Sequence, residues 1–130
     1  MDINNEKDMF TGKYEHLFEW EKEYLGVVIG VGADFIKKHL LLKYGVEQEH
    51  FIQTVKLPHI GLLDLLIQTE GVENFDRVIV YSKNDFKHKE EFLHLYRVCS
   101  EWELNFTTIR ENIQSEDFKN EKEFIRFLGL

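Results

Sequence analysis

One stretch, residues 76–113, constrains the fold of this chain more than any other. It opens with residues 77–81, a short run of β-branched and aromatic side chains typical of a buried strand. Apolar residues then recur at helical spacing, namely Phe92, Leu95, Tyr96, Cys99 and Trp102. Residues 106–109 predict a second strand. A strand, a helix and a strand in this order predict a right-handed crossover between two parallel strands.

The remaining segments continue this alternation. Residues 26–31 and 51–55 predict two further strands. Residues 35–44 predict a helix between them, with Asp34 as its N-cap and Gly45 as its end. A Leu-rich helix is expected over residues 60–68, after Pro58 and before Gly71.

A last short helix is expected after Ser115, which can cap it. Its apolar side is formed by Phe118, Phe124, Ile125 and Leu128. The whole order predicts a three-layer α/β domain, with a mostly parallel sheet of four to five strands and helices on both faces.

Length and composition indicate one globular domain with a short extension. The chain has 130 residues and a hydrophobic fraction of 43%, enough for a real core. We assign residues 1–25 to an N-terminal extension with one helix, and residues 26–130 to the domain. The single Cys excludes an internal disulfide and fits a cytoplasmic protein. We find no basic and apolar secretion signal and no run long enough to span a membrane.

The formal net charge of −8 argues against direct DNA binding, because DNA-binding proteins gain much of their affinity by neutralising phosphates. Lys83, Lys87, His88 and Lys89 form the densest basic cluster, but Glu90 follows at once. We interpret this cluster as the solvated start of a helix.

The N-terminal extension carries a helical apolar period formed by Tyr14, Leu17, Phe18, Glu21, Tyr24 and Leu25, with Phe10 and Trp20 beside it. Two interpretations stay open. The helix can pack on the domain, which needs its apolar faces covered. Alternatively, the aromatic side chains of Phe10, Tyr14, Phe18 and Trp20 bind a partner.

The sequence predicts neither a metal site nor a cofactor. Gly30 and Gly32 lie between a strand and a helix, as in a dinucleotide-binding turn, but Phe35 replaces the third glycine and would block the phosphate. The histidines show no zinc-binding spacing. Cys99 falls on the apolar stripe of the long helix, so we expect a core residue and not a nucleophile.

Four landmarks follow one another along the chain. They are LPHIGL at residues 57–62, VIVYSKNDF and EEFLHLYRVCSEWELNFTTI within residues 78–109, and RENI at residues 110–113. In this order they resemble the catalytic domain of the serine recombinases, the resolvase/invertase family. Its members carry Arg-Pro-Gly-Leu, a turn with Asp-Arg-Leu and Glu-Asn-Ile-Asp at these places. The resemblance covers residues 26–113 and implies a resolvase-like fold.

The family's chemistry depends on a serine after the first strand. Its hydroxyl attacks a DNA phosphodiester and is held as a phosphoserine, while arginines neutralise the phosphoryl oxygens. The family pattern is Tyr-x-Arg-Val-Ser, and it aligns here with Val28, Gly30 and Gly32. A glycine has no hydroxyl, so the resemblance implies that the nucleophile and one arginine are missing.

The second family signature, Asp-Arg-Leu-x-Arg-Ser, is also degenerate here. It aligns with Asn84, Asp85 and His88, so an acid and a histidine replace the two arginines. The family continues into a dimerising helix and a DNA-binding domain, whereas this sequence ends at Leu130. We therefore expect a truncated domain.

These losses favour a catalytically inactive, resolvase-like domain that acts as a regulatory or protein-interaction module, and not an enzyme. A phage or mobile-element origin would suit it. The partner would be a recombinase, a host factor or a second copy, so a homodimer is one of the possible assemblies.

The alternative is a metal-dependent or nucleotide-binding enzyme or sensor that reuses the cleft at the ends of the strands. Asp34, Ser82 and Glu111 would line this cleft, and Asp34, Asp85 and Glu111 could hold Mg²⁺. We favour a simpler interpretation, in which Asp34 and Asp85 cap helices and Glu111 lies on the surface.

Overall fold

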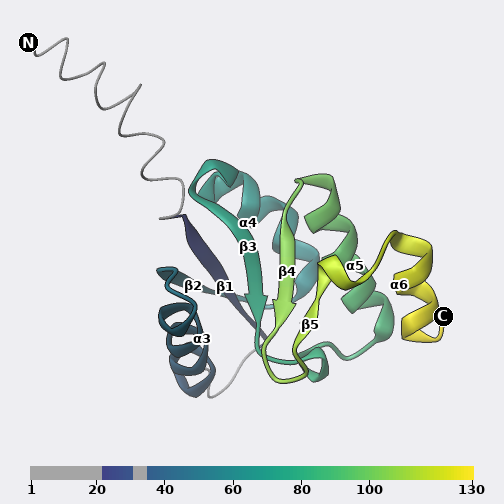
Figure 1. The fold of residues 1–130 in the computed structure, drawn as a ribbon, viewed down its shortest axis with the longest axis horizontal. Helices are drawn as coiled ribbons and strands as arrows, with labels where there is room; N and C mark the ends of the chain where they lie inside the picture. The colour runs from purple at the N-terminus through teal and green to yellow at the C-terminus, as the bar shows by residue number, and fades with distance from the viewer. Residues whose placement is uncertain (1–21, 31–34) are drawn as a thin grey trace, which may run out of the picture.

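A computed structural model describes residues 22–30 and 35–130 (Figure 1). The strands and main helices run in the order β1 (Glu23–Ile29), α3 (Phe35–Glu47), β2 (Ile52–Leu57), α4 (Leu63–Glu70), β3 (Phe75–Val80), α5 (Lys89–Glu101), β4 (Asn105–Thr108), β5 (Ile113–Gln114) and α6 (Glu121–Leu128). Short 3-10 turns cover Ile60–Leu62, Val72–Asn74, Lys83–Asp85 and Ser115–Asp117. The predicted N-terminal helix, including Phe10, Tyr14, Phe18 and Trp20, lies outside the described residues, as do Gly32 and Asp34.

The five strands form one sheet in the order β2-β1-β3-β4-β5. The pairs from β2 to β4 are parallel, and β5 joins the edge antiparallel to β4. The central strands β1 and β3 each contain a short apolar run, and Val27, Val28, Ile79 and Val80 are all buried. Such runs belong to strands that are covered on both faces. The predicted α/β class with a mostly parallel sheet is confirmed.

Helices cover the two faces unequally (Figure 1). On one face α3 packs against β1 and β2, around a small core of Val28, Leu41 and Ile79. The opposite face carries α4 and α5, with α6 packed against α5, over a much larger core. The apolar stripe predicted for α5 is buried in this core, and Cys99 is 1% exposed there. Burial also raises the pKa of the Cys99 thiol, as expected for a core residue.

An aromatic cluster fixes α6 on the larger core. The ring of Phe124 is fully buried and lies 5.2 Å from Phe92, 4.6 Å from Tyr96 and 5.9 Å from Phe106. These centroid distances suit stacked and edge-to-face pairs, which add to the gain from burying apolar area. Asn120 is the N-cap of α6, and its side chain accepts a hydrogen bond from the Glu123 N–H; Gly129, with φ +79°, is the C-cap.

The first strand begins earlier than the sequence predicts, at Glu23 and not at Gly26. Tyr24 and Leu25 were expected to continue the N-terminal helix, and they lie in this strand instead. The Tyr24 N–H donates to the Phe51 carbonyl over 2.8 Å, and Leu25 is 1% exposed. The ladder with β2 therefore overrides the helical period at these two residues.

The sequence predicts that Gly45 ends its helix, and this prediction is wrong. Gly45 lies buried inside α3, which continues to Glu47. A Cβ at position 45 would come within 2.8 Å of the Ile52 Cβ and 3.0 Å of the His50 carbonyl oxygen. The glycine thus lets the helix approach β2 closely.

Ser115 was expected to cap the last helix, but the structure shows a different role. Ser115 Oγ accepts from the Phe106 N–H and donates to Asn105 Oδ1, both over 3.0 Å. It lies in a 3-10 turn after β5, a two-residue strand that the sequence did not predict. Thr107 and Arg77 both donate to Gln114 Oε1, which holds β5 at the edge of the sheet.

The packing of α6 predicts a large difference between two phenylalanines on this one helix. We expect Phe124→Ala to lower the free energy of unfolding by about 3–5 kcal/mol, because it opens a cavity in the aromatic cluster. Phe127→Ala is the matched control: the ring is 49% exposed, so its loss should cost about 1 kcal/mol. Urea unfolding followed by circular dichroism measures both values. Equal losses would contradict the packing of α6 on the core.

Candidate functional site

The carboxyl ends of β1, β3 and β4 meet at one edge of the sheet, because these strands are parallel. This edge is the usual place for a ligand in an open α/β sheet. Gly30 follows β1 with φ +97°, and its N–H donates to the Leu57 carbonyl over 2.8 Å. Val28, aligned with the family tyrosine, lies inside the small core and is 2% exposed, so its side chain does not reach the edge.

Two of the three predicted cleft residues meet at this edge. Ser82 follows β3 and is 1% exposed. Its hydroxyl donates a hydrogen bond of 2.6 Å to Glu111 Oε2, and Glu111 Oε1 accepts from the Lys83 N–H over 3.0 Å. Asp34 lies outside the described residues. Glu111 was expected on the open surface, and it instead closes the turns after β3 and β4 onto each other.

Hydrogen bonds set the charge state of Glu111. Burial alone would raise the pKa of its carboxyl. The hydroxyl of Ser82, the N–H of Lys83 and the hydroxyl of Thr108 all donate to the carboxylate and outweigh burial, so the pKa lies below its ordinary value. An ionised carboxylate that already accepts several hydrogen bonds is a weak general base.

Ser82 also shapes its own turn. Its Oγ accepts the N–H of Asn84 over 3.0 Å and so caps the 3-10 turn Lys83–Asp85. With one bond donated and one accepted, the hydroxyl has fixed partners on both sides. Asn84 therefore contributes its backbone N–H to this turn.

The sequence analysis favoured Asp85 as a helix cap, but Asp85 pairs with a lysine instead. Its Oδ1 accepts from Lys37 Nζ over 2.7 Å, and its side chain is 6% exposed. The other oxygen, Oδ2, is buried and has no hydrogen-bond partner. The pair joins the turn after β3 to the first turn of α3 on the other face of the sheet. Lys37 was missed by the sequence analysis, although parallel topology places the start of α3 at this edge.

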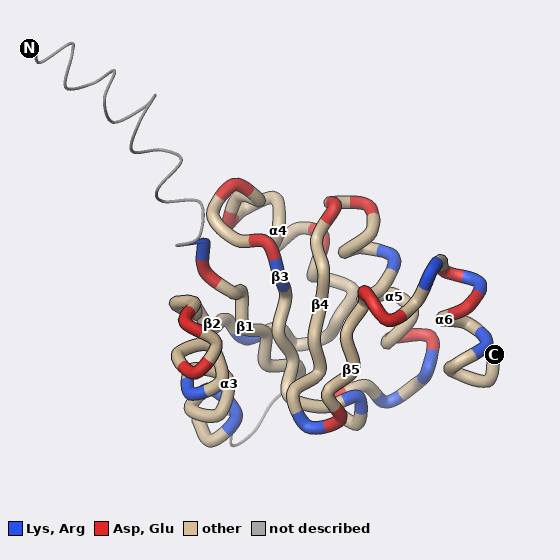
Figure 2. The backbone as a smooth tube through the Cα atoms, in the orientation of Figure 1, with Lys and Arg blue, Asp and Glu red and all other residues tan. Residues whose placement is uncertain are grey.

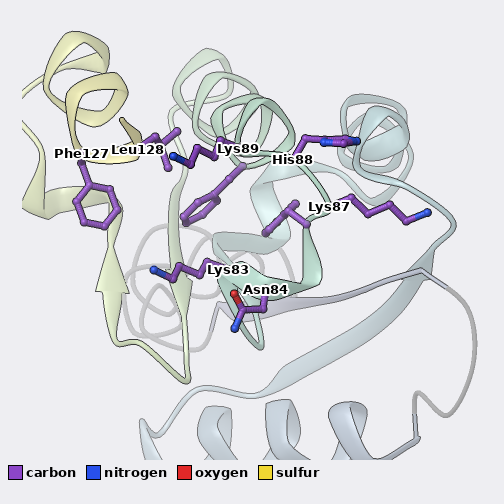
Figure 3. Close-up of a pocket in the computed structure, with 9 residues that line it drawn as sticks. Lys83, Asn84, Lys87, His88, Lys89, Phe127 and Leu128 are labelled. Atoms are coloured by element: carbon purple, nitrogen blue, oxygen red, sulfur yellow. The ribbon is translucent and has the colours of Figure 1, made fainter. Parts of the chain in front are cut away.

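His88 starts α5 without a side-chain cap. It lines a pocket of about 440 Å³ together with Lys83, Asn84, Phe86, Lys87, Lys89, Phe92, Phe127 and Leu128. Figure 3 shows the side chains of Lys83 and Lys89 on the side of Phe127, while those of Lys87 and His88 extend away from it. The basic cluster predicted as a solvated helix start thus borders a hollow between α5 and α6.

The described residues contain no group of three histidines, cysteines or acids that could hold a metal ion. The predicted set of Asp34, Asp85 and Glu111 includes Asp34, which lies outside the described residues, and Asp85 is bound by Lys37. Within the same ranges, no helix has the length and apolar character needed to cross a bilayer.

No family model matches the sequence. No curated protein gives a significant match either. One solved structure that resembles the fold is the crystal structure of a resolvase family site-specific recombinase from Streptococcus pneumoniae. The similarity has a TM-score of 0.63 at 12% sequence identity, and it covers 84% of each chain. It confirms the resolvase-like fold that the sequence landmarks implied, and at this identity it shows the fold alone.

The pair of Lys37 and Asp85 predicts a coupled effect on stability. Lys37→Met leaves a buried carboxylate without its cation, so we expect a loss of about 1–3 kcal/mol in the free energy of unfolding. Asp85→Asn in the same chain should recover part of the loss, because an amide is less costly to bury than an unpaired charge. Chemical unfolding of both single variants and the double variant measures the coupling. Additive losses would contradict a direct interaction.

The second prediction for this edge concerns pH. A carboxyl whose folded pKa lies below the unfolded value of 4.5 stabilises the fold above that pH, and this stability is lost as the pH falls through the folded value. Ser82→Ala removes a donor, so the pKa of Glu111 should rise and stability should vary less between about pH 3 and 5. Carboxyl NMR titration reports the pKa directly. Ser100→Ala, at an exposed serine of α5, is the control and should leave it unchanged.

Proposed function

We propose that this chain is a catalytically inactive resolvase-like domain that works by binding another protein. The observation that carries the proposal is the state of the carboxyl edge of the sheet. The serine and the acids that the structure describes there are engaged with partners inside the fold: Ser82 with Glu111, and Asp85 with Lys37. Gly32, which lies outside the described residues, has no hydroxyl to replace the family serine.

Ser82 is a poor candidate for a substitute nucleophile. A nucleophilic hydroxyl has to reach its substrate and to pass its proton to a base. The side chain of Ser82 is buried, and the pKa of its acceptor Glu111 is lowered, which weakens it as a base. Its geometry suits a structural hydrogen bond between two turns.

Arginines neutralise the phosphoryl oxygens in the family. Arg77 lies near the start of β3 and Arg97 within α5, and they pair with Glu116 and Glu121. The lysines near the turn after β3 are Lys37, which is bound to Asp85, and Lys83, Lys87 and Lys89, which line the pocket. Arg110 follows β4, and its N–H donates to the Tyr81 carbonyl over 2.8 Å. A single arginine does not replace the clamp of the family.

An exposed apolar surface supports the binding role. Phe35, Leu42 and Val46 lie seven and four residues apart on α3, and they are 69%, 48% and 61% exposed. Ile36 lies beside them and Phe51 follows the helix, both more than half exposed. Single apolar side chains on a surface are ordinary, but several exposed on one helix favour an interaction site. We refer to Phe35, Leu42 and Val46 as the α3 stripe.

The partner classes follow from the fold and the charge. A related recombinase, a host factor or a second copy of the chain would each offer an apolar surface to the α3 stripe. A net charge of −8 disfavours a nucleic acid as the main partner. A regulatory protein of phage or mobile-element origin fits these features.

The proposal predicts no strand cleavage. The purified full chain, incubated with supercoiled plasmid, should produce neither nicked DNA nor a covalent protein–DNA adduct on a denaturing gel. Nicking with an attached protein that is lost in Ser82→Ala would show that the buried serine reacts, and it would overturn the inactive assignment.

The binding role has its own readout in the same preparation. A partner captured from host lysate should be lost with Leu42→Glu and retained with Leu65→Glu, which changes a leucine of α4 that is 61% exposed. Both variants add the same charge to an exposed helix. Equal recovery of the partner with both variants would show that the α3 stripe is not its binding site.

A further inference from the structure

The pocket between the start of α5 and the end of α6 has no part in the function proposed above. Its volume of about 440 Å³ is that of a site for a small ligand. Neither Ser82, Glu111 nor any residue of α3 lines it. The described residues that do line it are mainly aromatic or basic, and they include no acid. Figure 2 shows the same basic cluster in blue where the chain enters α5.

Aromatic rings line the pocket from α5, from the turn before it and from α6. Phe86 and Phe92 are buried and stack on each other with their ring centroids 5.2 Å apart. On α6 the ring of Phe127 lies 5.1 Å from the ring of Phe118 and is still 49% exposed. Ring surfaces that border a hollow favour an aromatic ligand, because ring pairs gain more than the burial of apolar area alone.

Two lysines add positive charge to these rings. The side chains of Lys83 and Lys89 lie on the side of Phe127, whereas that of Lys87 extends away (Figure 3). Lys89 Nζ lies 3.3 Å from the position that a Cβ on Gly129 would take, so this ammonium group stands at the end of α6. Neither Lys83 nor Lys89 forms an ion pair with any residue in the ranges 22–30 and 35–130.

Two neighbouring acids are engaged elsewhere. The oxygens of Glu111 accept hydrogen bonds from the Ser82 hydroxyl and from the backbone N–H of Lys83. Glu91 Oε1 accepts from the backbone N–H of Lys87 over 2.9 Å. Within the described part of the chain, neither carboxylate pairs with an ammonium group of the pocket. The pocket therefore keeps an uncompensated positive charge beside its aromatic rings.

We infer that this pocket binds a small aromatic carboxylic acid in its ionised form. The aromatic body of the ligand lies against Phe127 and the buried rings, and its carboxylate lies between the ammonium groups of Lys83 and Lys89. A hydrogen bond between two charged groups is stronger than one between neutral groups. The inference is independent of the proposed function, because the pocket shares no residue with the α3 stripe.

Two other anions fit the pocket less well. Inorganic phosphate has no apolar body, so it would leave the exposed face of Phe127 uncovered. A nucleic acid would bring many phosphates close to a protein whose net charge is −8, and that charge repels them outside the pocket. An aromatic carboxylate brings a single negative charge and matches both the rings and the lysines.

Titration of the nitrogen-15-labelled full chain with 2-naphthoate, followed by amide NMR shifts, tests the inference. We expect saturable shifts centred on residues 83–92 and 127–128, with a dissociation constant of about 1 mM or below. The neutral analogue 2-naphthalenemethanol should bind at least about threefold more weakly, because it has no charge for the lysines. Added salt should weaken the binding of 2-naphthoate, since both lysines are exposed.

Variants of the pocket separate its charges from its rings. Lys83→Met and Lys89→Met should each raise the dissociation constant by about threefold to tenfold. Lys87→Met is the matched control: it removes the same charge from a lysine that extends away, so the constant should stay within about twofold. Phe127→Ala should raise it by about fivefold through the loss of a ring contact. Unchanged amide shifts in α3 show that each variant is folded.

Several results would overturn the inference. The absence of saturable shifts would show that the pocket does not take this class of ligand. Equal affinity for the neutral alcohol, or an equal loss of affinity in Lys87→Met and Lys83→Met, would remove the role of the two lysines. The same shifts with inorganic phosphate would indicate a general anion site, and displacement of 2-naphthoate by oligothymidylate would assign the pocket to nucleic acid. None of these readouts depends on partner capture, so the inference and the proposed function can fail separately.

Discussion

Burial of the central strands on both faces is the constraint on which the rest of this structure depends. Val27, Val28, Ile79 and Val80 are at most 2% exposed, and strands of this kind require helices on each side of the sheet. The larger face satisfies the requirement with α4, α5 and α6, and with rings such as Phe124 and Phe106 that fill the space between layers. The smaller face has one described helix, α3. The two faces therefore differ in how completely their outer surfaces are covered.

The polar groups at the carboxyl edge follow from the same constraint. Parallel strands end together, so the turns after them gather polar backbone and side-chain groups in a narrow region that must be satisfied. Ser82 and Glu111 join the turns after β3 and β4, and Lys37 and Asp85 join α3 to the turn after β3. In an enzyme of this architecture such groups would face a substrate. Here Ser82, Glu111, Lys37 and Asp85 hold the turns and α3 together, so these groups have a structural role at this edge.

The local spacing of apolar residues was enough to predict those elements whose buried face can be recognised from their own sequence. The stripe of Phe92, Leu95, Tyr96 and Cys99 predicted α5 because every fourth or third residue of a buried helix face must be apolar. Contacts between distant segments were not predictable in this way. Gly45 looked like a helix end because its role depends on Ile52 across the layer, and Asp85 looked like a cap because Lys37 lies 48 residues away. The strand β5 has two residues, too few for any alternation to appear. The fold class and two of the cleft residues could therefore be derived, and the pairings that give those residues their roles could not.

The exposed residues of α3 connect the burial pattern of the sheet and its helices to function. A helix that lay alone on a sheet would be expected to carry polar residues on its outer side, as α5 does with Glu90, Glu101 and Arg97. Helix α3 also exposes polar residues, namely His39, Lys43 and Glu47. In addition it exposes Phe35, Leu42 and Val46, while Leu41 and Gly45 are buried. Exposed apolar side chains gathered on one helix are a feature of interaction surfaces. The burial of the sheet side of α3 and the exposure of these three side chains are therefore consistent with the binding role that we propose for this helix.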